Sequence, residues 1–362
     1  MLMSDYKSIQ QDIEKIIKDG VQAPSGENCQ PWRFKIHNAK VSLYNIPEAD
    51  LSLYNSKQKG SYMAHGALIE NMIISAEKHG YAMEITLFPH DHDEILVADI
   101  IFSKKEKANQ EPLYDVIYKR CTNRKDYTGE TLTHEQKKKL QDSVERLGFS
   151  TLSIVDDSKH MQSLGVALAT NERVLFENKK LHNFFYDHIL WNKKDEDKAG
   201  GFYIDTLEFL PHQLKGVKLF KNWIVLRMLN KALKVSKMIS KENGEKYTKS
   251  GTFGALIMKG TTHKDYVNLG RSLQRLWLTA TLLDIAMHPC NGTIYLMGHI
   301  NDHSTGDFSG EHVAMLQKSY SDIVAAFDAG ESHIGFIFRM GKAPEPTAIA
   351  KRVAPRIEYN TT

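Results

Sequence analysis

Residues 23–34 read Ala-Pro-Ser-Gly-Glu-Asn-Cys-Gln-Pro-Trp-Arg-Phe, and the rest of the chain can be organised around this stretch. Pro24 and Gly26 are turn-forming residues, and Pro31 followed by Trp32 marks the exit into a strand. Short side chains that donate or accept hydrogen bonds stand between them, at Ser25, Asn28 and Gln30. A polar turn between a helix and a strand is commonly only a turn, so a function needs support from elsewhere. We predict a loop that closes on a flat ligand.

The overall composition is that of an ordinary globular protein. Of the 362 residues, 41% are hydrophobic and 25% are charged, which excludes a fibrous chain and allows two core-building units. The 47 basic and 44 acidic residues are too evenly balanced to argue for a nucleic-acid partner. Three cysteines without Cys-x-x-Cys spacing argue against a disulfide framework or a structural zinc site. Residues 1–20 hold no continuous apolar segment, so we expect no secretory signal or membrane span and predict a cytoplasmic protein.

Hydrophobic periodicity divides the first 110 residues into helices and strands. The predicted elements are a helix at 5–19, two strands within 32–44 joined by a turn at 37–39, a helix at 61–79, and strands at 81–87 and 95–102. The small residues Ala64, Gly66 and Ala67 predict close packing of the second helix. His90 and His92 fall between the last two strands and indicate a solvated turn, so no metal is predicted. The segment 103–112 is polar and ends in proline, which is typical of a linker. The first unit is therefore predicted to end near residue 110.

A basic cluster follows this linker, with the sequence Arg-Cys-Thr-Asn-Arg at 120–124. Arg120 and Arg124 can place two guanidinium groups around a phosphate, and the hydroxyl of Thr122 lies between them. A basic cluster is also the ordinary composition of a solvated surface. The arrangement is compatible with a phosphomonoester site but does not by itself establish one.

Both stretches resemble sequence motifs of the nitroreductase family. The family's flavin loop, Pro-Ser-(Ser/Gly)-x-Asn-x-Gln-Pro-Trp, is matched by Pro24, Ser25, Gly26, Asn28, Gln30, Pro31 and Trp32. The family's phosphate motif, Arg-x-(Ser/Thr)-x-Arg, is matched by Arg120, Thr122 and Arg124. The resemblance implies bound FMN that lies between two subunits, with the loop from one subunit and the phosphate-binding residues from the other. The absence of a dinucleotide glycine fingerprint favours FMN over FAD.

The two motifs lie in different halves of one chain, and each half lacks the motif that the other carries. We therefore predict two nitroreductase-like units, 1–110 and 111–362, fused into an intramolecular pseudo-dimer. The chain is similar in this respect to the Acg-type branch of the superfamily, which also has an Arg-x-Thr-Asn-Arg string at mid-chain. The expected fold class is α+β. A monomeric pseudo-dimer is expected, and further pairing is left open.

Periodicity and capping signals predict the elements of the second half. They are helices at 133–147, 158–178 and 265–286 and strands at 151–155, 253–258 and 334–340. Thr133 and Gln136 have the spacing of a capping box at the start of the first of these helices. The resemblance implies that the third of these helices leads to a loop that meets the flavin nitrogen N5. The matching residues are His288, Pro289, Cys290, Asn291 and Gly292, with Asn291 or Gly292 as the backbone amide donor. Lys351 and Arg352 stand where the family returns a basic residue to the phosphate. Cys29, Cys121 and Cys290 fall inside these motifs and are given no role.

Residues 179–250 are the part of the chain that least resembles the family. They are rich in aromatic residues and lysine, and within them 217–237 is a basic amphipathic stretch. Such a stretch fits either an anionic membrane or a lid over the protein's own site. The many aromatic residues favour an internal lid over membrane contact.

The resemblance implies an FMN-dependent oxidoreductase in which NAD(P)H reduces the flavin and a nitroaromatic or quinone acceptor reoxidises it by a ping-pong mechanism. No catalytic side chain is predicted, because the cofactor carries the chemistry. An alternative is a non-catalytic protein that sequesters FMN beneath the lid. A membrane-surface protein is a third hypothesis, which predicts vesicle binding that salt weakens.

Overall fold

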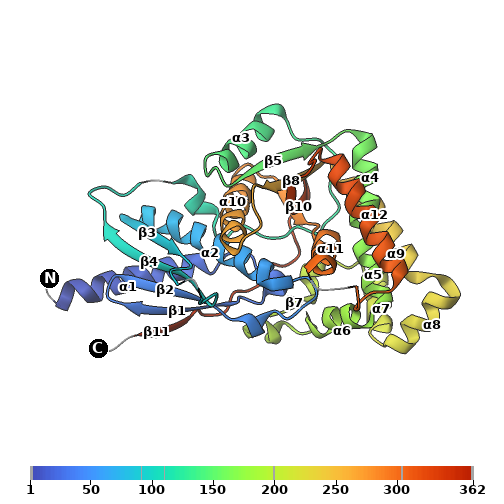
Figure 1. Cartoon of the computed structure of the whole chain (residues 1–362), viewed down its shortest axis with the longest axis horizontal. Coiled ribbons are helices and arrows are strands. Elements are labelled where there is room, and N and C mark those ends of the chain that lie inside the picture. The colour runs from blue at the N-terminus through green and yellow to red at the C-terminus, as the bar shows by residue number, and fades with distance from the viewer. Residues whose placement is uncertain (1–2, 91, 110, 199, 303–304, 360–362) are drawn as a thin grey trace.

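The computed structural model describes residues 3–90, 92–109, 111–198, 200–302 and 305–359. Asp91, in the histidine-containing turn, and Gln110, at the predicted end of the first unit, lie outside these residues. The described chain is a mixed α+β structure with two main sheets on either side of a central helix pair (Figure 1). None of its described helices has the length and apolar character needed to cross a membrane.

The first sheet has the strand order β11-β1-β2-β4-β3. Its strands are β1 (Trp32–His37), β2 (Lys40–Asn45), β3 (Tyr81–Leu87), β4 (Leu96–Lys104) and β11 (Arg356–Tyr359). The four predicted strands are confirmed, and Asn38 makes the turn between β1 and β2 with a φ of 54°. β11 was not predicted; it pairs in parallel with β1 and brings the end of the chain back to the first half. The helix α1 (Met3–Gly20) packs beside α2.

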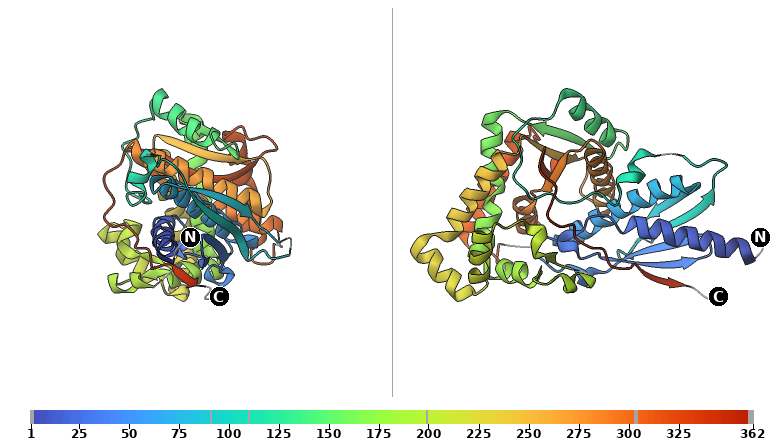
Figure 2. Two further views of the ribbon diagram at one scale, coloured as in Figure 1. Left: turned by 90° about the vertical axis from the view of Figure 1, so that its left-hand side faces the viewer. Right: turned by 180° about the vertical axis from the view of Figure 1, so that it is seen from behind.

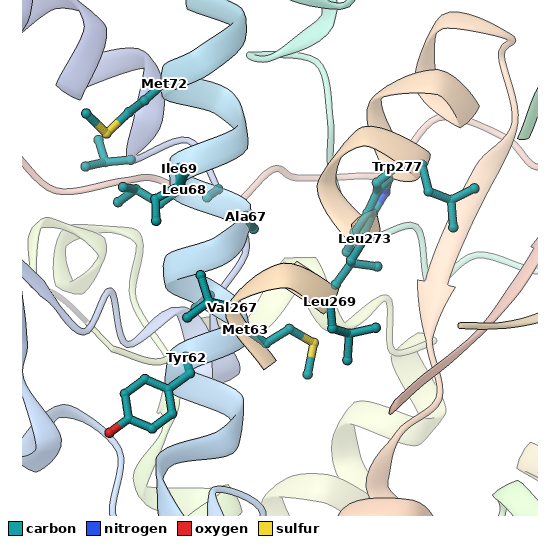
Figure 3. Close-up of a cluster of buried hydrophobic side chains, with 14 of the residues drawn as sticks. Tyr62, Met63, Ala67, Leu68, Ile69, Met72, Val267, Leu269, Leu273 and Trp277 are labelled. Carbon is teal, nitrogen blue, oxygen red and sulfur yellow. The ribbon is translucent and has the colours of Figure 1, made fainter. Parts of the chain in front are cut away.

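Two long helices, α2 (Lys59–Lys78) and α10 (His263–Leu282), form the centre of the molecule. They approach closely because Gly66 faces the backbone of Val267, and Gly270 faces the backbone of Met63. Figure 3 shows side chains of both helices meeting in one apolar cluster that continues into both sheets. Between the helices, the fully buried Glu70 pairs with Arg275 at 2.7 Å. The close helix packing expected from the small residues of 61–79 is therefore confirmed.

The second sheet has the order β5-β8-β10-β9, and all of its neighbours are antiparallel. Its strands are β5 (Ser150–Val155), β8 (Thr252–Met258), β9 (Ala286–Pro289) and β10 (His333–Gly341). The helix α3 (His134–Glu145) begins with the predicted capping box between Thr133 and Gln136. The helices α4 (Ser158–Leu168) and α12 (Gly310–Ala326) cover the face of this sheet that is opposite α3 (Figure 1). The sheet is thus buried on both faces.

One predicted helix is divided into two, and another ends earlier than expected. The helix predicted over 158–178 is divided at Ala169 into α4 and α5 (Thr170–Glu177). This division coincides with a contact from a distant part of the chain. The hydroxyl of Thr293 donates hydrogen bonds at 3.1 Å to the carbonyls of Ala167 and Leu168, at the end of α4. The helix predicted to reach residue 286 ends at Leu282, because Asp284 adopts a left-handed conformation with a φ of 56°.

The segment 179–250 is mostly helical. It contains α6 (Lys179–Asp187), α7 (Pro211–Phe220), α8 (Trp223–Leu233) and α9 (Val235–Thr248), and a small parallel pair of β6 (Ile189–Leu190) and β7 (Phe202–Tyr203). The helix α9 packs on α4 and α5, whereas α7 and α8 project at the end opposite the two termini (Figure 2). One more helix, α11 (Gly292–Asp302), follows β9.

Candidate functional site

A cavity of about 600 Å³ lies between the loop at 23–32, the central helices and the segment 179–250. This volume is within the range of small-molecule sites. Ten of the residues named for the site from the sequence line it, namely Pro24, Ser25, Gly26, Thr122, Arg124, His288, Pro289, Cys290, Asn291 and Gly292. They come from three stretches that are far apart in sequence. The structure therefore brings the loop, part of the basic motif and the loop after α10 together at one cavity.

The loop at 23–32 is held in a bent conformation with left-handed residues at Glu27, Asn28 and Gln30. The hydroxyl of Ser25 accepts a hydrogen bond from the Gln30 amide at 3.0 Å. The Asn28 side chain donates to the carbonyl of Lys351 at 3.0 Å, and the Gln30 side chain accepts from Val353 at 3.1 Å. Asn28 and Gln30 were predicted to contact the cofactor, but they lie outside the cavity lining and attach the C-terminal tail to the loop.

Two arginines, one buried and one partly buried, lie behind the cavity lining. Arg120 is only 5% exposed, stacks over the ring of Trp277 at 4.6 Å and donates to the Gln22 carbonyl at 3.3 Å. Arg352 donates to the neighbouring Ala23 carbonyl at 3.1 Å. Both arginines lie behind the cavity lining, beside Pro24. Burial lowers the pKa of Arg120 to about 10 and the pKa of Arg352 to about 9. Lys351 instead pairs with Asp197 at the surface and points away.

Arg124 reaches the cavity itself. It donates to the Thr206 carbonyl at 3.0 Å and lies over the ring of Phe202 at 5.2 Å. Within the described part of the chain, no carboxylate lies at ion-pair distance from Arg120, Arg124 or Arg352, and the Nε of Arg120 has no hydrogen-bond partner there. Buried cations without counter-ions are costly unless an anion completes the site. The arrangement therefore fits an anionic ligand group.

Sequence reasoning named His288 only as a loop residue and missed Arg339, which fixes the orientation of the His288 ring. Arg339 is fully buried and its Nε donates to the Nδ1 of His288 at 2.9 Å. This bond places the ring proton of His288 on Nε2, and burial beside Arg339 and Arg124 lowers the pKa of His288 well below its usual value. His288 lines the cavity as a neutral hydrogen-bond donor. Nothing local marks Arg339, because it stands in an apolar strand and meets His288 only through the pairing of β9 and β10.

The loop after α10 contributes backbone groups. Cys290 donates its amide to the Ile337 carbonyl at 2.9 Å, and the Asn291 side chain accepts from the Ile337 amide at 2.7 Å. Gly292 begins α11, where the first amides have no acceptor within the helix. These contacts leave the Gly292 amide, one of the two predicted donors, available to a ligand. Burial raises the pKa of Cys290 to about 12, and all three cysteines are free thiols.

Two acidic residues in the cavity wall were given no role in the sequence. Burial against the cavity wall, with Asp50 nearby, raises the pKa of Glu27 to about 8. Burial also raises the pKa of Glu172, which accepts a hydrogen bond from Tyr247 at 2.7 Å through Oε1. The other oxygen of Glu172 has no partner among the described residues. The cavity lining thus contains both Arg124 and the Glu27 carboxyl group, which is protonated at neutral pH.

The raised pKa of Glu27 predicts a pH-dependent stability in the flavin-free protein. Between pH 4.5 and about 8 the native state keeps the Glu27 proton and the unfolded state loses it, so stability falls as pH rises. In the wild-type protein we expect the free energy of unfolding to fall by roughly 3–5 kcal/mol across this pH range because of Glu27. Glu27→Gln is expected to abolish this fall. The check is urea unfolding at pH 5 and pH 8, with the exposed Glu145→Gln as the matched control. A difference between Glu27→Gln and wild type that does not grow with pH would contradict the assignment.

The fold and the cavity define an α+β protein with a cavity beside arginines that have no carboxylate partner among the described residues. No protein-family model matches the chain. A curated relative, the uncharacterized protein MT1398 of Mycobacterium tuberculosis (strain CDC 1551 / Oshkosh), is 22% identical over 341 residues, which cover 94% of this chain and 47% of the relative. The chain thus spans about half the length of the curated relative it matches.

One solved structure with a detectable likeness is a nitroreductase with bound FMN from Bacteroides fragilis. The match covers 67% of this chain and 95% of that chain, with 9% sequence identity and a TM-score of 0.37. Neither likeness is strong enough to assign the chain to a family.

Proposed function

We propose that the protein is an FMN-binding oxidoreductase of nitroreductase type. The observation that carries the proposal is a set of three arginines, buried or partly buried and without carboxylate partners among the described residues, beside a cavity that joins all three flavin-type stretches. In this assignment Arg124 and the hydroxyl of Thr122 hold the phosphate, and Arg120 and Arg352 add positive charge from behind the cavity lining. These arginines fit a phosphomonoester better than an uncharged ligand, because only an anion balances their charge.

The remaining polar groups of the cavity are assigned to the ring of the cofactor. The Gly292 amide and the Nε2 proton of His288 are donors to ring acceptors. Glu27 holds a proton at neutral pH and is the protein group placed to deliver it to an acceptor. Bound FMN supplies the two-electron redox chemistry, with NAD(P)H as the proposed donor and a nitroaromatic or quinone as the proposed acceptor.

The proposed architecture is a pseudo-dimer of two units, 1–110 and 111–362. The central contact of α2 with α10 and the apolar cluster shared by both sheets support it. The return of β11 to the first sheet gives the C-terminal tail a second link to the first unit. A cytoplasmic location stays a prediction.

A second candidate function is FMN sequestration without turnover. It is favoured by the aromatic side chains of the segment 179–250 that close the cavity, at Phe184, Phe185, Phe202, Phe209 and Phe220. If these side chains occupy the space that a substrate needs, the flavin is held but cannot react.

Anaerobic absorbance spectra after addition of NADH and then NADPH distinguish the two functions. The oxidoreductase assignment predicts that the bound flavin bleaches within seconds and recovers when a quinone or nitroaromatic is added. Flavin that stays bound and oxidised with both nucleotides establishes sequestration instead. A protein that takes up no FMN on reconstitution contradicts both functions.

A further inference from the structure

The segment 211–241 has an unusual charge. It contains eight basic residues and no acidic residue, and the basic residues are Lys215, Lys218, Lys221, Arg227, Lys231, Lys234, Lys237 and Lys241. The whole chain has 47 basic and 44 acidic residues. Without these eight, 39 basic residues face 44 acidic ones, so the remainder of the protein is net negative. The positive charge of the protein is therefore concentrated in α7, α8 and the start of α9.

The same segment exposes large apolar side chains. Among the described residues, fourteen large hydrophobic side chains are exposed, and six of them fall within 210–238. These six are Leu210, Leu219, Ile224, Met228, Leu233 and Met238, with exposures between 51% and 69%. Single exposed apolar residues need no explanation, but a concentrated group on one projecting segment marks an interaction surface.

The geometry of α8 separates an inner from an outer face. Leu226 is fully buried, and the carbonyl of Phe220 in α7 accepts a hydrogen bond from His182 Nε2 at 2.8 Å. These contacts fix the pair of helices α7 and α8, called the α7–α8 hairpin below, to the body of the protein. On the outer face, Ile224 and Met228 are one helical turn apart. Arg227 and Lys231 are exposed on the same side. This combination of aliphatic side chains and flanking basic residues is typical of helices that lie in a membrane interface.

The predicted lid explains only the inner face of this segment. Val217 and Phe220 line the cavity, together with Ile239 from α9. The outer aliphatic residues are not among the side chains that line the cavity or form the core clusters. The helices α7 and α8, which carry most of them, stand at the end of the molecule opposite both termini (Figures 1 and 2).

We propose that the outer surface of α7, α8 and the first turn of α9 docks on an anionic phospholipid bilayer. The basic side chains lie among the lipid phosphates, and Ile224 and Met228 insert between the headgroups. The central apolar pair favours a bilayer over nucleic acid, which offers phosphates but no apolar layer at the depth of these side chains. The protein binds the bilayer from one side and does not cross it.

Vesicle co-sedimentation of the full chain tests this surface. We use vesicles of phosphatidylcholine alone and vesicles in which roughly a third of the lipid is phosphatidylglycerol. The proposal predicts binding to the anionic vesicles that is at least about tenfold tighter than to the neutral ones and that weakens as salt is raised. Equal binding to both vesicles, or no binding to either, would overturn it.

Paired variants separate charge from apolar insertion. Arg227→Glu with Lys231→Glu is expected to weaken binding at least about tenfold, and Ile224→Ser with Met228→Ser to weaken it by several-fold. The matched controls are Arg146→Glu with Lys264→Glu and Val166→Ser, all exposed and away from the hairpin. These are expected to bind as wild type does. Circular dichroism confirms that each variant is folded, and the proposal fails if folded hairpin variants bind as the controls do or if wild type binds duplex DNA but no vesicle.

Discussion

Replacing Arg124 with alanine is expected to yield a folded protein that retains almost no FMN. Arg124 is the arginine that both lines the cavity and lacks a carboxylate partner among the described residues. A charge-assisted, bidentate contact to phosphate is the strongest interaction that the site offers. Its loss is expected to weaken FMN binding by about 100-fold, or roughly 3 kcal/mol. Quenching of flavin fluorescence on titration with protein measures the affinity.

Two further variants sharpen this prediction. Arg124→Lys keeps the charge but loses the planar fork, so it is expected to recover only part of the affinity. Arg227→Ala removes an exposed arginine of α8, outside the cavity lining, and is expected to leave FMN affinity unchanged. A thermal melt of the flavin-free Arg124→Ala variant detects any loss of packing over Phe202. Wild-type FMN affinity in a folded Arg124→Ala protein would contradict the phosphate assignment.

Replacing Gly66 with alanine is expected to destabilise the protein by more than about 3 kcal/mol. A Cβ at this position would lie 1.8 Å from the backbone carbonyl oxygen of Val267, so α2 and α10 would have to separate. Because the apolar cluster of both sheets is built on these two helices, their separation disturbs the whole core. The check is the urea unfolding midpoint, which is expected to fall substantially.

The chain offers a matched control for this substitution in Gly298, a helical glycine of α11. A Cβ there meets nothing within 4 Å. Gly298→Ala is therefore expected to be neutral or to stabilise by up to about 1 kcal/mol, because alanine has the higher helix propensity. If Gly66→Ala unfolds within about 1 kcal/mol of wild type, the helix crossing does not require glycine.

Much of the fold could be predicted from the sequence because its signals are local. The capping box at Thr133 and the turn at Asn38 depend on neighbouring residues and are present where predicted. The periodic stretches that became α2, β8 and β10 are long enough to specify their own secondary structure. The prediction that the 23–32 loop and the loop after α10 lie at one site came from the resemblance to a known family. Hydrophobic periodicity alone does not predict which loops lie close together.

The features that were missed depend on contacts between distant residues. β11 is a short and largely exposed segment that becomes a strand only by pairing with β1. Thr293 divides α4 from α5 although it lies more than a hundred residues further along the chain. Glu27 was visible in the loop, but its raised pKa arises from burial and from Asp50, which no local pattern reveals.

The segment 179–250 shows how one sequence pattern can serve two surfaces. Its aromatic residues line the cavity, as a lid requires, while its aliphatic residues on α8 face outward. The amphipathic pattern of 217–237 does not predict which face of the helices packs against the rest of the protein. Only the packing of Leu226 against the body of the molecule decides that.

The most direct test of the central claim is the ratio of the affinities of the wild-type protein for FMN and for riboflavin, which lacks the phosphate. Both ligands are titrated under the same conditions, and flavin fluorescence is followed. If Arg124 and Thr122 hold the phosphate, FMN binds at least about 100-fold more tightly than riboflavin, and the preference largely disappears in Arg124→Ala. Equal affinities of the wild-type protein for the two flavins would contradict the account.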